Sequence, residues 1–147
     1  VLTAGSIHLE EGSVRALTDL EDTVGHLRET LWRPSSEGFS LMRTDYHWAD
    51  AGPAWPQTPE DTALALLEAA LLDLTDEARG YAAPGLTLPR EGDGEAAVTL
   101  RYGAPQGRNA VGLLRAVSET LARVQPVYYR AEPQGGAQGP YRITALE

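Results

Sequence analysis

Cysteine and lysine are both missing from this chain of 147 residues. The lack of cysteine excludes thiolate nucleophiles, CxxC redox motifs, iron–sulfur clusters and Cys-ligated zinc. The lack of lysine excludes a Schiff-base lysine and the lysine of a P-loop. No apolar run approaches the roughly 20 residues that a helix needs to span a bilayer. The chain is still long enough to bury a core, so we expect a globular domain without a membrane partner.

Asparagine, isoleucine, phenylalanine and methionine are also scarce, whereas glycine, alanine, arginine and proline are abundant. GC-rich codons encode the abundant set, which indicates a GC-rich, bacterial source. The first residues, VLTAGSIHLEEG, lack the basic stretch and the long apolar stretch of a secretory signal. We therefore expect a cytoplasmic protein.

The charge of the chain is unevenly distributed. Twelve basic residues against 21 acidic ones give a formal net charge of −9. Residues 1–97 hold nearly all of the acidic side chains, while residues 98–147 hold six arginines and only three acids. Because neutralisation of phosphates dominates nucleic-acid affinity, the net negative charge of this chain disfavours nucleic-acid binding.

Three stretches place apolar residues at intervals of three and four, the spacing of a helix with one buried face. They are residues 13–32, 59–79 and 108–124. The second has the clearest ends, since Thr58 can cap it, Pro59 suits its first position and Gly80 can end it. Leucines and alanines cover most of its circumference, which predicts a central core helix or one that also serves a dimer interface.

Alternation of apolar and polar residues predicts strands at 96–102, 127–131 and 141–145, the last two forming a hairpin. Residues 7–9 and 39–45 are weaker strand predictions. Together these elements predict an α+β fold, with about three helices packed on one face of a mainly antiparallel sheet of four to five strands. We expect a single domain over residues 1–147 that ends in a β-α-β-β unit, with two very small domains as the alternative.

The turn from Gly103 to Asn109 is the first candidate site, because it lies between a predicted strand and a predicted helix. Free N–H groups at a helix N-terminus bind anions, and Gly103 and Gly107 would let an anion come close. Arg108 would add a bidentate contact beside Asn109. The alternative is an ordinary turn in which Asn109 caps the helix.

The second candidate is the segment 32–59, which holds all three tryptophans. Tyr46, His47, Trp48 and Trp55 are the residues that we expect to contact a protein partner, because long ordered loops with aromatic side chains are frequent binding sites. The alternative is a loop whose aromatic rings cover the core.

The histidines do not predict a metal site. His8, His26 and His47 lack any known ligand spacing. Asp22 and His26 would form an ordinary pair one turn apart on the water-facing side of the helix predicted at 13–32.

The arginines of residues 98–147 form the last candidate surface. Arg108, Arg115 and Arg123 would lie on the polar side of the predicted third helix. Three further arginines alternate with core positions in the predicted strands, giving a sheet face like those on which nucleic-acid bases stack; its residues would be Arg101, Arg130, Arg142, Thr99, Tyr128 and Thr144. The alternatives are solvated ion pairs, or docking of the acidic part of the chain on the basic part.

No GxSxG motif or Ser/His/Asp grouping is present, and nothing predicts a cofactor. We therefore expect a non-enzymatic binding or assembly module with a protein partner, or one that self-associates as a homo-oligomer. The first alternative is a small enzyme or sensor that binds an anionic metabolite or nucleotide at Gly103–Asn109. The second is a nucleic-acid accessory protein that uses the Arg/Tyr face.

Overall fold

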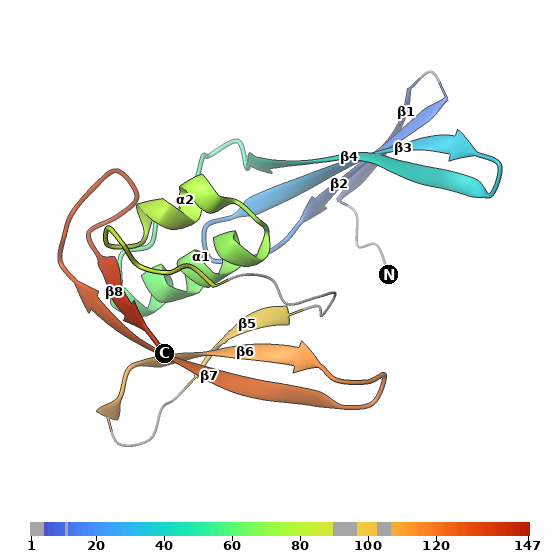
Figure 1. Cartoon of the computed structure of the whole chain (residues 1–147). Helices are drawn as coiled ribbons and strands as arrows, with labels where there is room; N and C mark the ends of the chain where they lie inside the picture. The colour runs from blue at the N-terminus through green and yellow to red at the C-terminus, as the bar shows by residue number, and fades with distance from the viewer. Residues whose placement is uncertain (1–4, 11, 90–96, 103–106) are drawn as a thin grey trace. The chain divides into compact units, whose positions relative to one another are not determined.

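A computed structural model describes residues 5–10, 12–89, 97–102 and 107–147. The described chain is an α+β fold with two helices and two antiparallel four-stranded sheets (Figure 1). The predicted class is confirmed, but two sheets and two helices replace the single sheet with three helices. The chain divides into two compact units, Val1–Ala54 and Trp55–Glu147. The assignment of residues 1–147 to a single domain stays a prediction.

The N-terminal unit is a meander of four antiparallel strands, each paired with its neighbours in the sequence. Its strands are β1 (Ser6–Glu10), β2 (Ser13–Asp19), β3 (His26–Ser35) and β4 (Gly38–Trp48). The weak predictions at 7–9 and 39–45 are thus confirmed as β1 and β4. Met42 is an extra residue in β4, because the register with β3 shifts between Leu31 and Trp32.

The helix predicted over 13–32 is wrong, since this stretch forms β2, a turn and most of β3. Two aspartates build the turn: the side chain of Asp19 accepts a hydrogen bond from the backbone N–H of Glu21, and that of Asp22 accepts from Gly25 and His26. Gly25 has φ +90°, a conformation that a helix interior cannot contain. Side-chain hydrogen bonds to the backbone therefore favour a turn over the helix.

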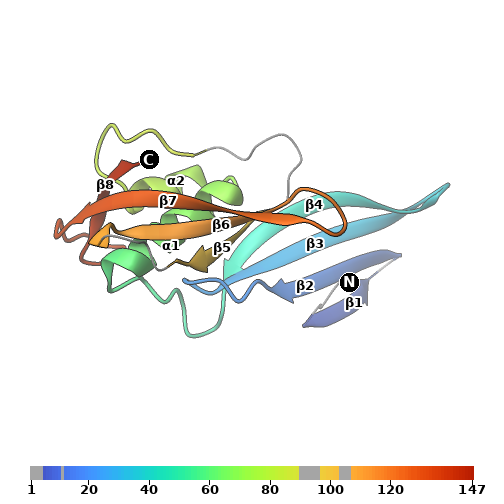
Figure 2. The same cartoon turned by 90° about the horizontal axis from the view of Figure 1, so that it is seen from below.

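The C-terminal unit contains both helices and the second sheet. The helices are α1 (Pro59–Leu71) and α2 (Thr75–Gly80), and the strands are β5 (Ala97–Arg101), β6 (Ala110–Ala116), β7 (Ala122–Glu132) and β8 (Arg142–Leu146). The sheet order β5-β6-β7-β8 is antiparallel throughout, and α1 packs against all four strands (Figure 2). The strands predicted at 96–102, 127–131 and 141–145 and the pairing of the last two are confirmed.

The helix predicted over 59–79 is present but interrupted. The Thr58 side chain accepts a hydrogen bond from the Asp61 N–H at 3.1 Å, as its capping position predicted. The buried residues of α1 include Leu64, Leu66 and Leu67, which confirms a core helix. Asp73 adopts φ +60° and ends the first helix, and aspartate tolerates this conformation better than most residues do.

The helix predicted over 108–124 is wrong, and the expected β-α-β-β unit is a run of four strands. Residues 110–116 and 122–132 are neighbouring strands, joined by a short turn in which the Val117 N–H donates to the Leu121 carbonyl. Gly112 lies in the middle of β6, where a Cβ atom would come within 2.6 Å of the Leu100 side chain. Glycine at position 112 leaves room for the side chain of Leu100 on the neighbouring strand. The spacing of apolar residues along the sequence does not show this requirement.

Candidate functional site

The N-terminal sheet has one face made largely of apolar side chains. Side chains alternate between faces along each strand, and the register places Leu9, Val14, Trp32 and Leu41 in one row across all four strands. Neighbouring rows add Ile7 and Phe39 to the same face. We call this set the apolar face; its residues are Ile7, Leu9, Val14, Trp32, Phe39 and Leu41.

Much of the apolar face is accessible to solvent. Leu9 is 80% exposed, Ile7 62%, Phe39 57% and Leu41 50%. Burial of large apolar side chains lowers the free energy, and monomeric proteins seldom display such residues in a contiguous row. The row is therefore a candidate binding surface.

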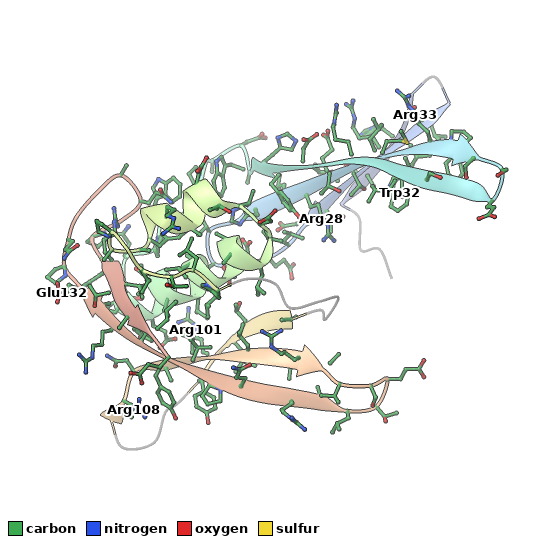
Figure 3. All side chains as sticks on the ribbon, viewed as in Figure 1. Arg28, Trp32, Arg33, Arg101, Arg108 and Glu132 are labelled. Atoms are coloured by element: carbon green, nitrogen blue, oxygen red, sulfur yellow. The ribbon has the colours of Figure 1, made fainter. Side chains whose placement is uncertain are left out.

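The opposite face of the same sheet carries several ion pairs, together with Leu17, Leu27 and Leu31. Arg15 and Glu29 lie 3.9 Å apart, His47 and Glu29 lie 3.8 Å apart, and Arg43 and Asp45 pair at 2.6 Å. Figure 3 shows Arg28 and Trp32 on one side of β3 and Arg33 on the other. The ion pairs favour contact of this face with solvent, so the two faces of the sheet differ in the number of charged side chains that they carry.

The aromatic residues predicted to share one partner-facing loop are divided between strand and loop. Tyr46, His47 and Trp48 belong to β4, and strand alternation directs His47 to the face opposite the other two. Trp55 belongs to the C-terminal unit, where its ring makes an edge contact with Tyr81 at 6.4 Å between centroids. The single loop is wrong as a structural prediction. A role for these four residues in partner binding stays a prediction.

His26 is buried and pairs with a half-buried Asp22, in place of the solvated helical pair that the sequence predicted. His26 Nδ1 lies 2.5 Å from Asp22 Oδ2, and the Trp48 ring lies 4.6 Å from the His26 ring between centroids. Burial acts to raise the pKa of Asp22, but the hydrogen bonds from His26 and Gly25 and the His26 charge outweigh it, so the pKa lies below its usual value. The pair fastens the β2–β3 turn, and its burial gives it a structural role.

The anion site predicted at Gly103–Asn109 lacks the helix on which it depended. Gly103 lies outside the described residues, and Gly107, at φ +72°, leads through Arg108 and Asn109 into a strand. Without a helix N-terminus at this point, the backbone N–H groups of a first helical turn are not available to an anion. The side chain of Arg108 nevertheless lies in a site of another kind.

Arg108 lines a surface hollow of about 380 Å³ on the C-terminal unit. Its guanidinium carbon lies 3.8 Å from the centre of the Tyr128 ring, and its Nη2 donates to Glu147 Oε2 at 3.0 Å. We call this site the Arg108 hollow; it is lined by Arg108, Asn109, Tyr128, Tyr129, Arg130, Ala145 and Glu147. Figure 3 shows Arg108 just before the start of β6.

The hollow joins residues from two of the predicted sites. Antiparallel pairing sets Ala110 opposite Tyr128, which brings the Arg108 segment beside the β7 residues of the predicted Arg/Tyr face. Burial, followed by the negative charges of Glu60 and Asp61, raises the pKa of Tyr129. The Tyr129 hydroxyl thus stays protonated at neutral pH, and the arginines supply the positive charge of the hollow.

The continuous Arg/Tyr face is not formed. Arg101 pairs with Glu60 and with Asp61 of α1, and these hydrogen bonds raise the pKa of the Arg101 guanidinium (Figure 3). The register sets Arg101 on the side of the sheet that carries Val111 and Val127, whereas Tyr128 and Arg130 point the other way.

Two other arginines of the predicted surface are also placed differently. Arg115 and Arg123 oppose one another across β6 and β7 instead of lying along a helix. Thr99 donates to Glu68 of α1 at 2.7 Å, so the polar side of β5 is occupied by contacts with the helix.

The apolar face was missed because the helix assigned to residues 13–32 hid its period-two pattern. Val14 and Ala16 alternate with the polar residues Ser13 and Arg15, which is the pattern of a strand, but these apolar residues also fit the helical spacing.

Within the described ranges, no three or more histidine, aspartate or glutamate side chains lie close enough to hold a metal ion, and no helix is long and apolar enough to cross a membrane. No protein-family model matches this chain, and neither a curated protein nor a solved structure matches it.

Proposed function

We propose that this protein is a non-enzymatic binding or assembly module that self-associates through the apolar face of its N-terminal sheet. The row of Leu9, Val14, Trp32 and Leu41 crosses all four strands, with Leu9 and Leu41 exposed and Val14 and Trp32 half-buried, and it is the observation that carries the proposal. Antiparallel sheets commonly bury one face and leave the other in contact with water, and here the face that carries the ion pairs is the one suited to water.

A second copy of the same chain is the partner that this face fits best. A two-fold interface brings a surface against itself, so a surface with many charges of one sign would repel its own copy. Strand alternation assigns Arg28 to the apolar face, whereas Arg15, Glu29, Arg43 and Asp45 all lie on the opposite side. A face with so little charge can pair with itself without strong repulsion.

A matched pair of variants tests this proposal. Leu41→Glu adds a carboxylate to the apolar face, and Ser40→Glu adds the same charge to the opposite face of the same strand. Light scattering over a range of protein concentrations should show an oligomer for the wild type and for Ser40→Glu. We expect Leu41→Glu to raise the dissociation constant at least about tenfold, because the new charge loses its hydration in the interface.

Two results would contradict self-association through this face. One is a wild-type protein that stays monomeric at every concentration up to the millimolar range. The other is equal weakening of the oligomer by Leu41→Glu and Ser40→Glu, which would indicate a general charge effect and not a specific interface.

Binding of a small anion is the second candidate function, and the Arg108 hollow supports it. A nucleic-acid accessory role has weaker support, because Arg101 is engaged with α1 and points away from Arg130. The chain's formal net charge of −9 also disfavours binding to the phosphate backbone of a nucleic acid.

A further inference from the structure

We propose that the Arg108 hollow binds a small dicarboxylate, with one carboxylate on Arg108 and the other on Arg130. This site is independent of the apolar face, since the hollow is built from residues of the C-terminal unit.

The first half of the site is an arginine held ready for a carboxylate. The Arg108 guanidinium stacks on the Tyr128 ring with its carbon 3.8 Å from the ring centre. Stacking occupies one flat side of the guanidinium and leaves its N–H edge free to donate. That edge already donates to a carboxylate, because Nη2 lies 3.0 Å from Glu147 Oε2. The ligand chemistry of this position is therefore that of a carboxylate.

The second half of the site is an arginine with no such engagement. Arg130 follows Tyr128 by two residues on β7, so both side chains leave the same face of the strand about 6–7 Å apart at the backbone. The Arg130 guanidinium makes no hydrogen bond or ion pair with the residues that the structure describes. The carboxylate of Glu132, two positions further along, accepts a hydrogen bond from Gln134 Nε2 at 3.1 Å.

The side-chain charges in the hollow are therefore unequal. Two guanidinium groups, those of Arg108 and Arg130, line it together with the single carboxylate side chain of Glu147. A ligand with two carboxylates can take the place of Glu147 on Arg108 and also neutralise Arg130. A ligand with one carboxylate can only replace the Glu147 carboxylate on Arg108. It therefore gains little binding free energy, because one carboxylate–arginine pair is exchanged for another.

Size and lining favour a small molecule. A volume of about 380 Å³ lies at the lower end of the range for small-ligand pockets. The Tyr128 ring and the Ala145 methyl group offer apolar surface to a short carbon chain between the two carboxylates, and Asn109 can donate from its side-chain amide.

Amide NMR of the full chain, titrated at constant ionic strength, tests the proposal with succinate as the probe. Propionate is the matched ligand with one carboxylate, and inorganic phosphate represents a compact anion. We expect succinate to move the amide signals of Asn109 and Arg130. We also expect succinate to bind at least about tenfold more tightly than propionate or phosphate, because each of its two carboxylates would form a charged hydrogen-bonded pair that contributes to the binding free energy.

Four variants assign the binding to this hollow. Arg108→Gln and Arg130→Gln should each weaken succinate binding at least about tenfold. Glu147→Gln should strengthen succinate binding by up to about fivefold, because it removes the exposed Glu147 carboxylate that competes with succinate for Arg108. Arg123→Gln, which removes an exposed arginine of β7 outside the hollow, should leave it unchanged. A gain in affinity for Glu147→Gln cannot come from misfolding.

Several outcomes would overturn the proposal. Equal binding of propionate and succinate would remove Arg130 from the site. Tighter binding of phosphate than of succinate would replace the dicarboxylate with a compact anion. Absence of signal changes at tens of millimolar succinate, or equal weakening by Arg123→Gln and Arg108→Gln, would show that the hollow is not a specific site.

Discussion

Replacing Leu66 with alanine is expected to lower the free energy of unfolding by about 2–5 kcal/mol, the range for leucines in a packed core. Leu66 is completely buried in α1, and its neighbour Leu67 is only 1% exposed. α1 packs against α2 and against all four strands of its sheet, so a cavity at this helix is surrounded by structure that cannot close around it. Urea denaturation followed by circular dichroism at 222 nm measures the loss, because both helices lie in the C-terminal unit.

The matched control for this prediction is Leu121→Ala. Leu121 carries the same side chain in the turn between β6 and β7, where it is 54% exposed. The same deletion there should change the free energy of unfolding by no more than about 0.5 kcal/mol. A loss below about 1 kcal/mol for both Leu66→Ala and Leu67→Ala would mean that α1 is not the centre of the core.

α1 could be predicted from the sequence because its signals are local and agree with one another. Thr58 caps the helix, Pro59 occupies its first turn, and the apolar residues that follow are too continuous for a surface element. Only its end was misplaced, since the apolar run continues past Asp73 to Leu74. The left-handed conformation of Asp73 ends the helix, and the identity of this one residue is a weak signal.

The two wrong helices share a cause. Their apolar residues recur every three or four positions, but two strands that flank a turn can produce the same spacing by chance. The contrary signals were Asp19, Asp22 and Gly25 in the first stretch and Gly112 in the second. Each of them favours a turn or a strand through local hydrogen bonding or through space for a neighbouring side chain, effects that a count of apolar intervals does not include.

The Arg108 hollow could be predicted only in part. Arg108 and Tyr128 were each singled out from the sequence, but for different sites. They come together because β6 and β7 are antiparallel neighbours with Ala110 opposite Tyr128. Strand pairing between residues about 20 positions apart depends on register, which is set by the turn and by the buried face. A helix over residues 108–124, as the apolar spacing predicts, would not place these two residues side by side.

Removing the Asp22 side chain is expected to destabilise the N-terminal unit by about 3 kcal/mol. In Asp22→Ala, the buried His26 ring loses the carboxylate that lies 2.5 Å from it, and the backbone N–H groups of Gly25 and His26 lose their acceptor. Breaking a buried charged pair by removing one partner is strongly destabilising, because the other polar group remains buried. Asp22→Asn keeps an acceptor for the backbone N–H groups, so its loss of unfolding free energy should be only about half that of Asp22→Ala. Urea denaturation followed by tryptophan fluorescence measures the stability of both variants, since Trp32 and Trp48 lie in this unit.

The same carboxylate makes the stability of this unit depend on pH in the acid range. The pKa of Asp22 is lower in the folded chain than its usual value of 3.8, so the unfolded chain takes up a proton first as the pH falls. The contribution of Asp22 is therefore complete above about pH 5 and is lost progressively as the pH falls below 3.8 towards the folded pKa. Asp22→Asn should have a flatter profile below pH 5 than the wild type. Asp45→Asn, in which the carboxylate of an exposed pair with Arg43 is replaced, should keep the wild-type profile. Identical acid profiles for the wild type and Asp22→Asn would show that the Asp22–His26 pair does not stabilise the fold.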